Sequence, residues 1–309
     1  MLDVSKLETL RSVVAHGSFS AAGDAIGLTQ PAVSRQVALL ERQLGTQLVR
    51  RTRQGVQATE AGRLLAEHAE AIVGRLALAE AQVADLAGLR SGHVRLGSFF
   101  TALVYLSAEL GALLEARHPE LFASQPQVIE DELVDRATAF RRLSAGELDA
   151  AIVFEHAFEP DPPPADVELV HLFDDPPCIL VPAGHPVAGA ASVRPAELGG
   201  VTWIRAHHGS AARLLDHVLE RAGPRPAIVH AGHGDEPVEA QAFVAAGHGV
   251  MVAHRLNVLI EPGRIAVVAL EDAPVRHIQV ATLRGQRAPA VRAAVDALRQ
   301  VAVARTARG

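Results

Sequence analysis

The chain has 309 residues, of which 49% are hydrophobic, enough for the cores of two or three domains and too many for a disordered tail. Its formal net charge is −6 and its one cysteine, Cys178, excludes an intramolecular disulfide and a two-cysteine redox switch, leaving only a single-thiol sensor open. Because Cys178 lies in the apolar run CILVP, we expect it to be buried in a strand. Residues 2–16 are amphipathic and no apolar run is long enough for a membrane span, so we expect a cytoplasmic protein with no membrane partner.

Residues 18–45 carry the pattern of two short helices joined by a tight turn. Gly27 suits the left-handed end of the first helix, and Pro31 suits the first turn of the second. The second helix has one apolar face, formed by Val33, Val37, Leu40 and Leu44. Its opposite side carries small, hydrogen-bonding and basic residues, namely Pro31, Ser34, Arg35, Ala38 and Arg42. Such a helix fits the major groove of DNA, although Ala-rich helix pairs also occur in ordinary helical bundles.

The segment that follows is basic and has the pattern of a hairpin. Arg50, Arg51 and Arg53 surround a Gln54-Gly55 turn, as in a two-stranded wing that contacts phosphates or the minor groove. Residues 1–60 hold seven Lys/Arg and five Asp/Glu, so the acidic excess of the chain lies entirely in residues 61–309. This partition of charge favours the DNA-binding interpretation of the helix pair.

The run GSFSAAGDAIGLTQPAVSRQVALLERQLGTQLVRR, followed by TEAG, resembles the N-terminal signature of LysR-type transcriptional regulators. The resemblance implies a winged helix-turn-helix DNA-binding domain over residues 1–59. It places the DNA-contacting positions on Gln30, Pro31, Ser34 and Arg35 of the recognition helix and on Arg53 of the wing. Helical periodicity independently exposes Pro31, Ser34 and Arg35, whereas Gln30 depends on its place at the helix N-terminus.

A long linker helix is expected next, over residues 60–90, with Thr59 as its cap. Its apolar positions recur in heptads, at Leu65, Ala69, Ile72, Leu76, Ala79, Val83 and Leu86. This seam predicts a coiled-coil dimer, with an amphipathic helix lying on its own domain as the alternative. A dimer suits an operator with dyad symmetry, and a dimer of dimers is the family's usual assembly.

From residue 93 onward strands alternate with helices, which predicts parallel sheets with right-handed crossovers. The order resembles the family's two-lobed α/β effector domain, itself similar to periplasmic solute-binding proteins, and GELDAAIV at 146–153 and VAAGHGVMVA at 244–253 are matching marks. We expect an effector-binding domain at 91–309, with lobe I at 91–162 and 266–303 and lobe II at 163–265. His248 and His254 depart from the family pattern near the interlobe region.

Ligands of open α/β sheets bind at the carboxyl ends of strands, beside helix N-termini. The resemblance and this rule together give the candidate effector-binding residues Ser98, Phe99, Phe100, Thr101, Thr202, Trp203 and Arg205. Thr101 could instead be a plain helix cap, Trp203 a core residue and Arg205 an ordinary surface residue. Two adjacent Phe residues in a chain with 4% aromatic residues, together with Arg205, predict an acidic and partly apolar effector.

Histidine is abundant, with 15 residues, and His230-x-x-His233 precedes Asp235-Glu236. Such a set could hold zinc or nickel, but the sequence neighbours His207 and His208 would point apart on a strand. We therefore predict no metal site and no cofactor.

These patterns predict a LysR-type transcriptional regulator, dimeric or tetrameric, that binds an interrupted palindrome in double-stranded DNA and responds to an effector between its lobes. RNA polymerase is a further expected partner if the protein is an activator. A solute-binding transport receptor would need an export signal and would not need the DNA-binding domain at residues 1–59. An enzyme is not expected, because GxSxG, P-loop and HExxH motifs are absent from the sequence and the acidic pairs Glu130-Asp131 and Asp174-Asp175 are adjacent rather than facing. A protein–protein adaptor would explain less of the sequence.

Overall fold

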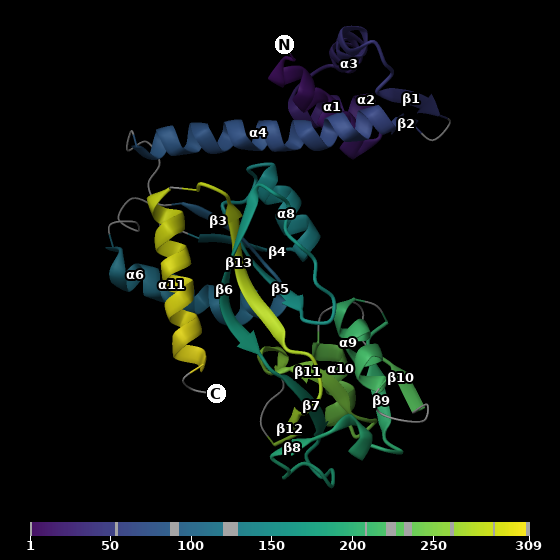
Figure 1. The fold of residues 1–309 in the computed structure, drawn as a ribbon, viewed down its shortest axis with the longest axis vertical. Helices are drawn as coiled ribbons and strands as arrows, with labels where there is room; N and C mark the ends of the chain where they lie inside the picture. The colour runs from purple at the N-terminus through teal and green to yellow at the C-terminus, as the bar shows by residue number, and fades with distance from the viewer. Residues whose placement is uncertain are drawn as a thin grey trace.

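The structure is a computed structural model that describes residues 2–52, 55–86, 93–119, 129–207, 209–220, 227–231, 237–259, 263–286 and 288–306. A helical head lies at one end, a long helix α4 crosses beneath it, and two α/β lobes follow (Figure 1). This arrangement confirms the expected class of a winged helix-turn-helix head, a linker helix and a two-lobed α/β domain. Within the described residues, no helix combines the length and the apolar character needed to cross a membrane.

The head is built from three helices and a two-stranded hairpin. These elements are α1 (Val4–His16), α2 (Phe19–Ile26), α3 (Gln30–Leu44), β1 (Val49–Thr52) and β2 (Gly55–Ala58). Gly27 ends α2 with a left-handed φ of 67°, as the sequence predicts, because a residue without Cβ adopts that conformation at little cost. Val33 and Val37 of α3 pack against Val13 and Phe19, which fixes α3 on the other two helices.

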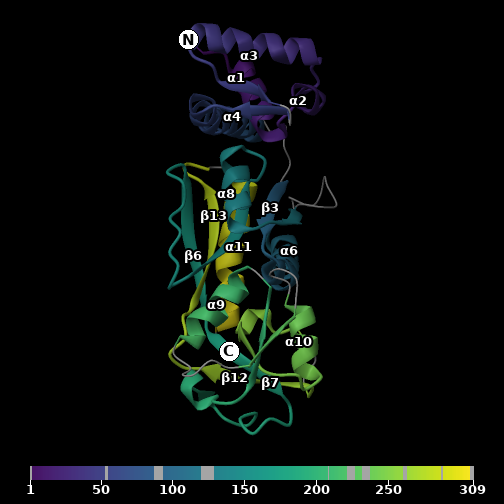
Figure 2. The same ribbon diagram turned by 90° about the vertical axis from the view of Figure 1, so that its right-hand side faces the viewer.

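Helix α4 (Glu60–Leu86) joins the head to the first lobe. The Thr59 hydroxyl accepts a hydrogen bond from the Gly62 amide at 3.0 Å, which confirms the predicted N-cap. Further along, a Cβ at Gly74 would overlap the carbonyl oxygen of Ser144, so α4 approaches the effector domain backbone to backbone at this residue. Figure 2 shows the helix that ends at Ser144 directly below α4.

Lobe I is a five-stranded sheet with helices on both faces. Its elements are β3 (Val94–Ser98), α5 (Phe100–Ala102), the π-helix η1 (Leu103–Ser107), α6 (Ala108–Arg117), β4 (Ile129–Leu133), α8 (Arg136–Ser144), β5 (Ala150–His156), β6 (Val167–Asp175), β13 (Arg276–Leu283) and α11 (Pro289–Thr306). The strand order is β4-β3-β5-β13-β6, in which β13 runs antiparallel to both of its neighbours. One core lies between the sheet and helices α6 and α11, and a second lies under α8.

Lobe II contains a four-stranded sheet and a two-stranded parallel sheet. Its elements are β7 (Pro177–Pro182), β8 (Ser192–Val193), η2 (Pro195–Glu197), β9 (Thr202–Arg205), α9 (Ser210–Leu219), β10 (Ala227–His230), α10 (Val238–Ala245), β11 (Met251–His254), η3 (Arg255–Asn257) and β12 (Ile265–Leu270). The strand orders are β11-β7-β12-β8 and β10-β9, and a parallel bridge from Trp203 to Val250 joins the two sheets.

The sheet pairings move the expected lobe boundaries. Strand β6, placed in lobe II on sequence grounds, pairs with β13 in lobe I, and β12, placed in lobe I, pairs with β7 in lobe II. The chain therefore passes between the lobes at residues 175–177 and 270–276. The Pro-rich stretch at 160–164 suggested an earlier boundary, but it is a loop that returns to the same sheet. The antiparallel pairs of β13 and of β7 also make both large sheets mixed rather than parallel.

Candidate functional site

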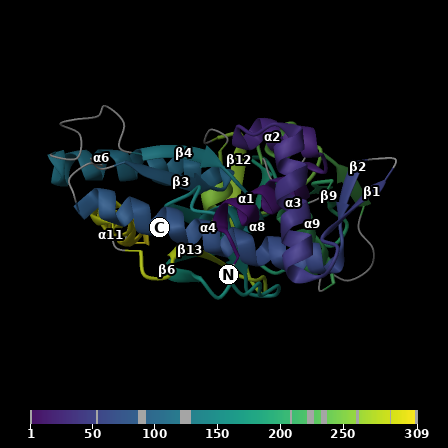
Figure 3. The ribbon, with the colours of Figure 1, turned by 90° about the horizontal axis from the view of Figure 1, so that it is seen from above.

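Helix α3 lies at the end of the head that is farthest from the lobes (Figures 1 and 3). Gln30, Pro31 and Arg35 are exposed and Ser34 is half-buried. The predicted apolar face is confirmed at Val33, Val37 and Leu40, which are at most 1% exposed. Leu44, at 42% exposed, departs from it because α3 ends there, beyond the core of the head. The exposed face is thus free to enter a groove of DNA.

The hairpin after α3 has the form of a wing. Strands β1 and β2 pair antiparallel from Val49–Ala58 to Thr52–Gly55, and the exposed Arg50 lies on β1. The Val56 amide donates to the Gly17 carbonyl at 2.7 Å, which holds the hairpin against the turn between α1 and α2. Arg53, the predicted wing contact, lies outside the described residues.

A cavity of about 820 Å³ lies between the two lobes. Lobe I contributes Phe99, Phe100 and Thr101, which follow the carboxyl end of β3, and Arg136, which begins α8. Lobe II contributes residues at the start of α9 and at the end of β11. The volume falls in the range of sites for small organic ligands.

One member of a buried ion pair, Arg276, lines this cavity. The Arg276 guanidinium donates to Asp175 at 2.5 Å, and the two side chains are only 4% and 2% exposed. Arg276 also donates to the side-chain oxygen of Asn257 at 2.9 Å, and the Thr101 hydroxyl donates to the same oxygen at 2.9 Å. Since Asn257 ends η3, directly after β11 of lobe II, and Thr101 belongs to lobe I, this network ties the two lobes together.

Aromatic rings line the cavity next to this network. Phe99 and Phe154 meet edge to face, with ring centroids 4.9 Å apart, and the Arg276 guanidinium lies 5.1 and 4.9 Å from their centroids. His156 continues the row, 5.5 Å from Phe154 and 5.1 Å from His254. A ligand with an aromatic or apolar part can therefore pack here.

His156 is a buried polar group directed at the cavity. It is 5% exposed, and neither ring nitrogen has a hydrogen-bond partner among the described residues. Burial, and then the charges of Arg276 and Arg213, lower its pKa to about 3. Burial likewise holds the pKa of His254 well below its usual value. Both imidazoles are therefore neutral near pH 7, and His156 can either donate a hydrogen bond to a ligand or accept one.

The cations that line the cavity have carboxylate partners. Arg213 of α9 donates to Glu159 at 2.7 Å, Arg136 lies 3.5 Å from Asp161, and Arg276 binds Asp175. The Arg213–Glu159 pair crosses the mouth of the cleft, because Glu159 lies in the loop between β5 and β6 of lobe I. Both side chains of this pair are about half exposed, so Glu159 is the carboxylate that a ligand carboxylate can most easily displace from its arginine.

The structure separates the predicted effector residues into two groups. Phe99, Phe100 and Thr101 line the cavity, whereas Ser98 is fully buried behind them. Thr202, Trp203 and Arg205 do not line it: Trp203 is 0% exposed in the core of lobe II, and Arg205 is held by Asp216 at 2.6 and 3.0 Å. The residues of this strand–helix unit that reach the cavity come later, at Ala206, Ser210, Ala211, Arg213 and Leu214.

Sequence reasoning missed several cavity residues. His156 and Arg136 could have been found, because they follow the rule used for Thr101: one ends a parallel strand and the other begins a helix. His254 was noted only as a departure from the family pattern near the interlobe region. Asn257 and Arg276 gave no signal, since Asn257 lies in the short helix η3 and Arg276 begins an antiparallel strand.

The remaining candidate chemistry is limited. Cys178 is fully buried, as predicted, and burial raises the pKa of its thiol to about 12, which argues against a reactive thiolate. In lobe II the rings of His207 and His230 stack with centroids 5.5 Å apart. His208, His233, Asp235 and Glu236 lie outside the described residues.

Comparisons with known proteins cover both parts of the chain. The model of the bacterial regulatory helix-turn-helix protein, lysR family, matches residues 4–63, and that of the LysR substrate binding domain matches residues 87–303. The HTH-type transcriptional regulator CbbR of Sinorhizobium medicae is 28% identical over 306 residues, which cover 94% of this chain and 91% of the relative.

Solved structures share the fold over nearly the whole chain. A full-length OxyR variant from Pseudomonas aeruginosa superposes with a TM-score of 0.68 at 24% identity, covering 97% of this chain and 95% of that one. Full-length CbnR in complex with its target DNA gives a TM-score of 0.58 at 19% identity, with 97% and 100% of the two chains covered.

Proposed function

Because the chain belongs to the LysR family of bacterial transcriptional regulators, we propose that its heads bind an interrupted palindrome under the control of a small molecule in the interlobe cavity. The exposed polar face of α3 carries this proposal: its three buried residues fix the helix, and its opposite side is open to DNA. The protein then acts by binding rather than by catalysis, at the chromosome in the cytoplasm.

We assign DNA contact to Gln30, Pro31, Ser34 and Arg35 of α3 and to Arg53 of the wing. An Arg on a recognition helix can make a bidentate bond to guanine, and Ser34 can bond to a base or a phosphate. A wing arginine beside the exposed Arg50 adds phosphate or minor-groove contact. CbnR, which shares the fold, has been solved with its target DNA.

We propose that α4 is the dimer interface. Of its heptad positions, Ile72, Leu76 and Val83 are 44%, 45% and 66% exposed. Gly74 faces lobe I, and Ile72 borders a hollow that it shares with Ser144 and Leu283 of that lobe, while part of its side chain stays exposed. The exposed part of the seam, from Ile72 to Val83, is available to a second α4, whereas Ala69 is fully buried and Leu65 packs against the core of the head. Two such dimers give the tetramer that binds successive half-sites, and an activating tetramer would then also contact RNA polymerase.

We propose an effector with an aromatic or apolar part and one acidic group. Its ring packs on Phe99, Phe100 and Phe154, its acidic group replaces Glu159 at Arg213, and a further polar group meets His156 or Thr101. Binding across the cleft changes how the lobes close and so moves the heads, which alters operator occupancy or bending. Arg205, Thr202 and Trp203 support lobe II in this scheme and do not touch the ligand.

The test of the DNA-binding assignment compares Ser34→Ala and Arg35→Ala with the unchanged protein. An operator is first selected by that protein from random DNA, and affinity is measured by fluorescence anisotropy. Each variant should lose about 1–3 kcal/mol of specific binding and relax the preference at one base position. Arg299→Ala on α11 is the matched control. Unaltered operator affinity in both α3 variants would show that another surface contacts DNA.

A further inference from the structure

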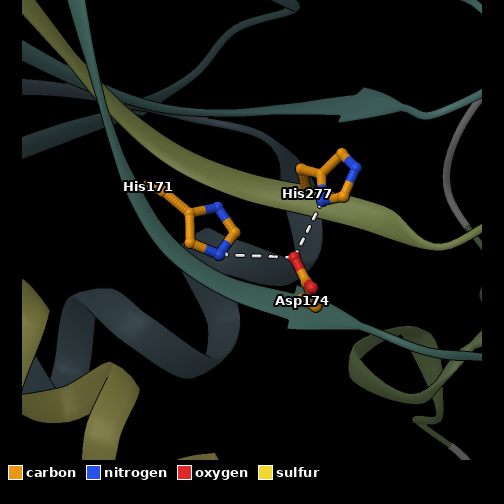
Figure 4. Close-up of side chains that lie close together, drawn as sticks. All are labelled: His171, Asp174 and His277. Atoms are coloured by element: carbon orange, nitrogen blue, oxygen red, sulfur yellow. Dashed lines mark hydrogen bonds and ion pairs between the residues drawn. The ribbon is translucent and has the colours of Figure 1, made fainter.

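Two histidines and one aspartate converge on the surface of lobe I and are not among the residues that line the cavity. His171 and Asp174 lie on β6 and His277 on β13 (Figure 4). The Asp174 carboxylate oxygen is 3.3 Å from Nε2 of His171 and 2.8 Å from Nδ1 of His277, and the three potential ligand atoms all lie within 4.8 Å of one another. These residues lie neither in the histidine-rich segments around residues 207–208 and 230–233 nor in the effector cavity.

A β-bulge brings the three side chains to one face. Residues three apart in a regular strand point to opposite faces of the sheet, so His171 and Asp174 should not meet. In this sheet Asp174 is opposite His277 and Phe173 opposite Ile278, but His171 is opposite Gln279, which leaves Leu172 as an extra residue. The bulge turns His171 onto the face of Asp174, and such bulges often re-aim a side chain beside a functional site.

The donor set suits a transition metal rather than magnesium or calcium. Imidazole nitrogens favour ions such as Zn²⁺, Ni²⁺ and Co²⁺, whereas Mg²⁺ and Ca²⁺ prefer an all-oxygen shell. Ligand atoms about 2.0–2.1 Å from a tetrahedral ion lie about 3.3 Å apart, close to the two distances to Asp174. The three side chains are 36–58% exposed, so small rotations can close the set without disturbing a core.

We propose that His171, Asp174 and His277 form a binding site for a divalent first-row transition ion such as Zn²⁺. Three protein ligands leave at least one coordination position for water.

The site lies at the hinge between the lobes. Asp174 and His277 are adjacent in sequence to Asp175 and Arg276, the buried ion pair, and both strands leave lobe I at this point. An ion bound at this site therefore joins β6 to β13 next to that pair. The bound ion makes the hinge more rigid, so the effector domain responds to a metal ion as well as to the effector.

Equilibrium dialysis of the full-length protein against Zn²⁺ tests the site, with Co²⁺ absorption as a report on coordination. Asp174→Asn and His277→Ala should each lose one ion per chain, or bind it more than about tenfold more weakly, and should lose the corresponding cobalt bands. His171→Ala, at the most exposed histidine of the set, gives a further variant that should fold normally.

The matched control removes the stacked pair in lobe II with His207→Ala and His230→Ala. That double variant should keep the ion held by β6 and β13. The proposal is overturned if zinc stoichiometry, affinity and cobalt spectrum are the same in the hinge variants as in the unchanged protein, or if all bound metal disappears with the lobe II pair. Thermal melting followed by circular dichroism confirms that each variant is folded.

Discussion

His156 shows what a single residue contributes to this cavity. A buried imidazole without hydrogen bonds lowers the stability of the protein, because its desolvation is not compensated. The cost is understandable if a ligand completes the bonding, since an unpaired polar group in a cavity then discriminates strongly between ligands that can and cannot pair with it. His156 is thus placed to set specificity while Phe99 and Phe154 supply apolar contact.

The stability of the effector domain should depend on pH through this residue. The folded pKa of His156 is about 3, below its unfolded value of about 6.5, so below pH 6.5 the unfolded state binds a proton that the folded state does not. Stability contributed by neutral His156 is therefore full above pH 6.5 and falls as pH drops toward 3. The expected slope is about 1.4 kcal/mol per pH unit for one such histidine, and His254 adds to it.

Urea unfolding between pH 4.5 and 8 measures this slope. His156→Phe should reduce the dependence of the unfolding free energy on pH by the contribution of one proton. His248→Phe, at an exposed position, is the control and should give the slope of the unchanged protein. Equal slopes in the unchanged protein and in His156→Phe would mean that the imidazole is protonated inside the fold.

Which site residues could be predicted depends on how each reaches its position. Phe99 to Thr101 follow a parallel strand, so local sequence and a general rule place them at the cavity. The prediction for Arg205 was wrong because the same rule does not say how far beyond the strand the cavity begins. The prediction for Trp203 was wrong because an apolar ring can pack in a core as well as against a ligand. In the sequence Asp174 is only one of an adjacent acidic pair. Its two histidine neighbours depend on the bulge at Leu172, which is a feature of long-range strand pairing.

Among the elements, α4 is the proposed dimer interface. Its seam was predictable because a heptad pattern is local, whereas the contact of Gly74 with Ser144 joins residues far apart in sequence and left no pattern. The predicted lobe boundaries differ from the observed ones for a similar reason. VELVHLF and CILVP both have the pattern of apolar strands, and only their hydrogen-bonded partners assign them to different sheets.

Charged residues in the seam should separate the dimer. Ile72→Asp together with Leu76→Asp removes two apolar contacts from the proposed interface, each worth about 1.5–3 kcal/mol when fully buried. The dissociation constant of the dimer should therefore rise at least about 100-fold. Sedimentation velocity over a range of concentrations gives the mass. Val303→Asp, at an apolar residue that is 69% exposed on α11, is the matched control. If the double variant sediments as the unchanged protein does, assembly uses another surface.

For the molecule as a whole, the closure of the lobes depends on links across the cleft. The Arg213–Glu159 pair spans its mouth, and Phe158, next to Glu159, packs against the core of lobe II. Releasing Arg213 should let a ligand carboxylate bind without competition. Glu159→Gln should therefore tighten binding of small aromatic carboxylates about two- to fivefold, the range expected for an exposed ion pair.

Calorimetry with a panel of aromatic carboxylates and their amides separates charge from shape. The amides should bind Glu159→Gln and the unchanged protein alike, and Glu197→Gln, in a distant exposed pair with Arg194, should change neither class. A carboxylate-to-amide preference that is the same with and without Glu159 would contradict an acidic group at Arg213.

The close approach at Gly74 makes α4 a lever. Its fulcrum is the backbone of Ser144, and about 21 Å of helix separates Gly74 from the first residue of α4 at the head. A tilt of about 10° at the fulcrum then displaces the head by about 4 Å, similar to the spacing of about 3.4 Å between successive base pairs. In the proposed mechanism, a small rotation of lobe I would thus be enough to shift a recognition helix by one step along its operator.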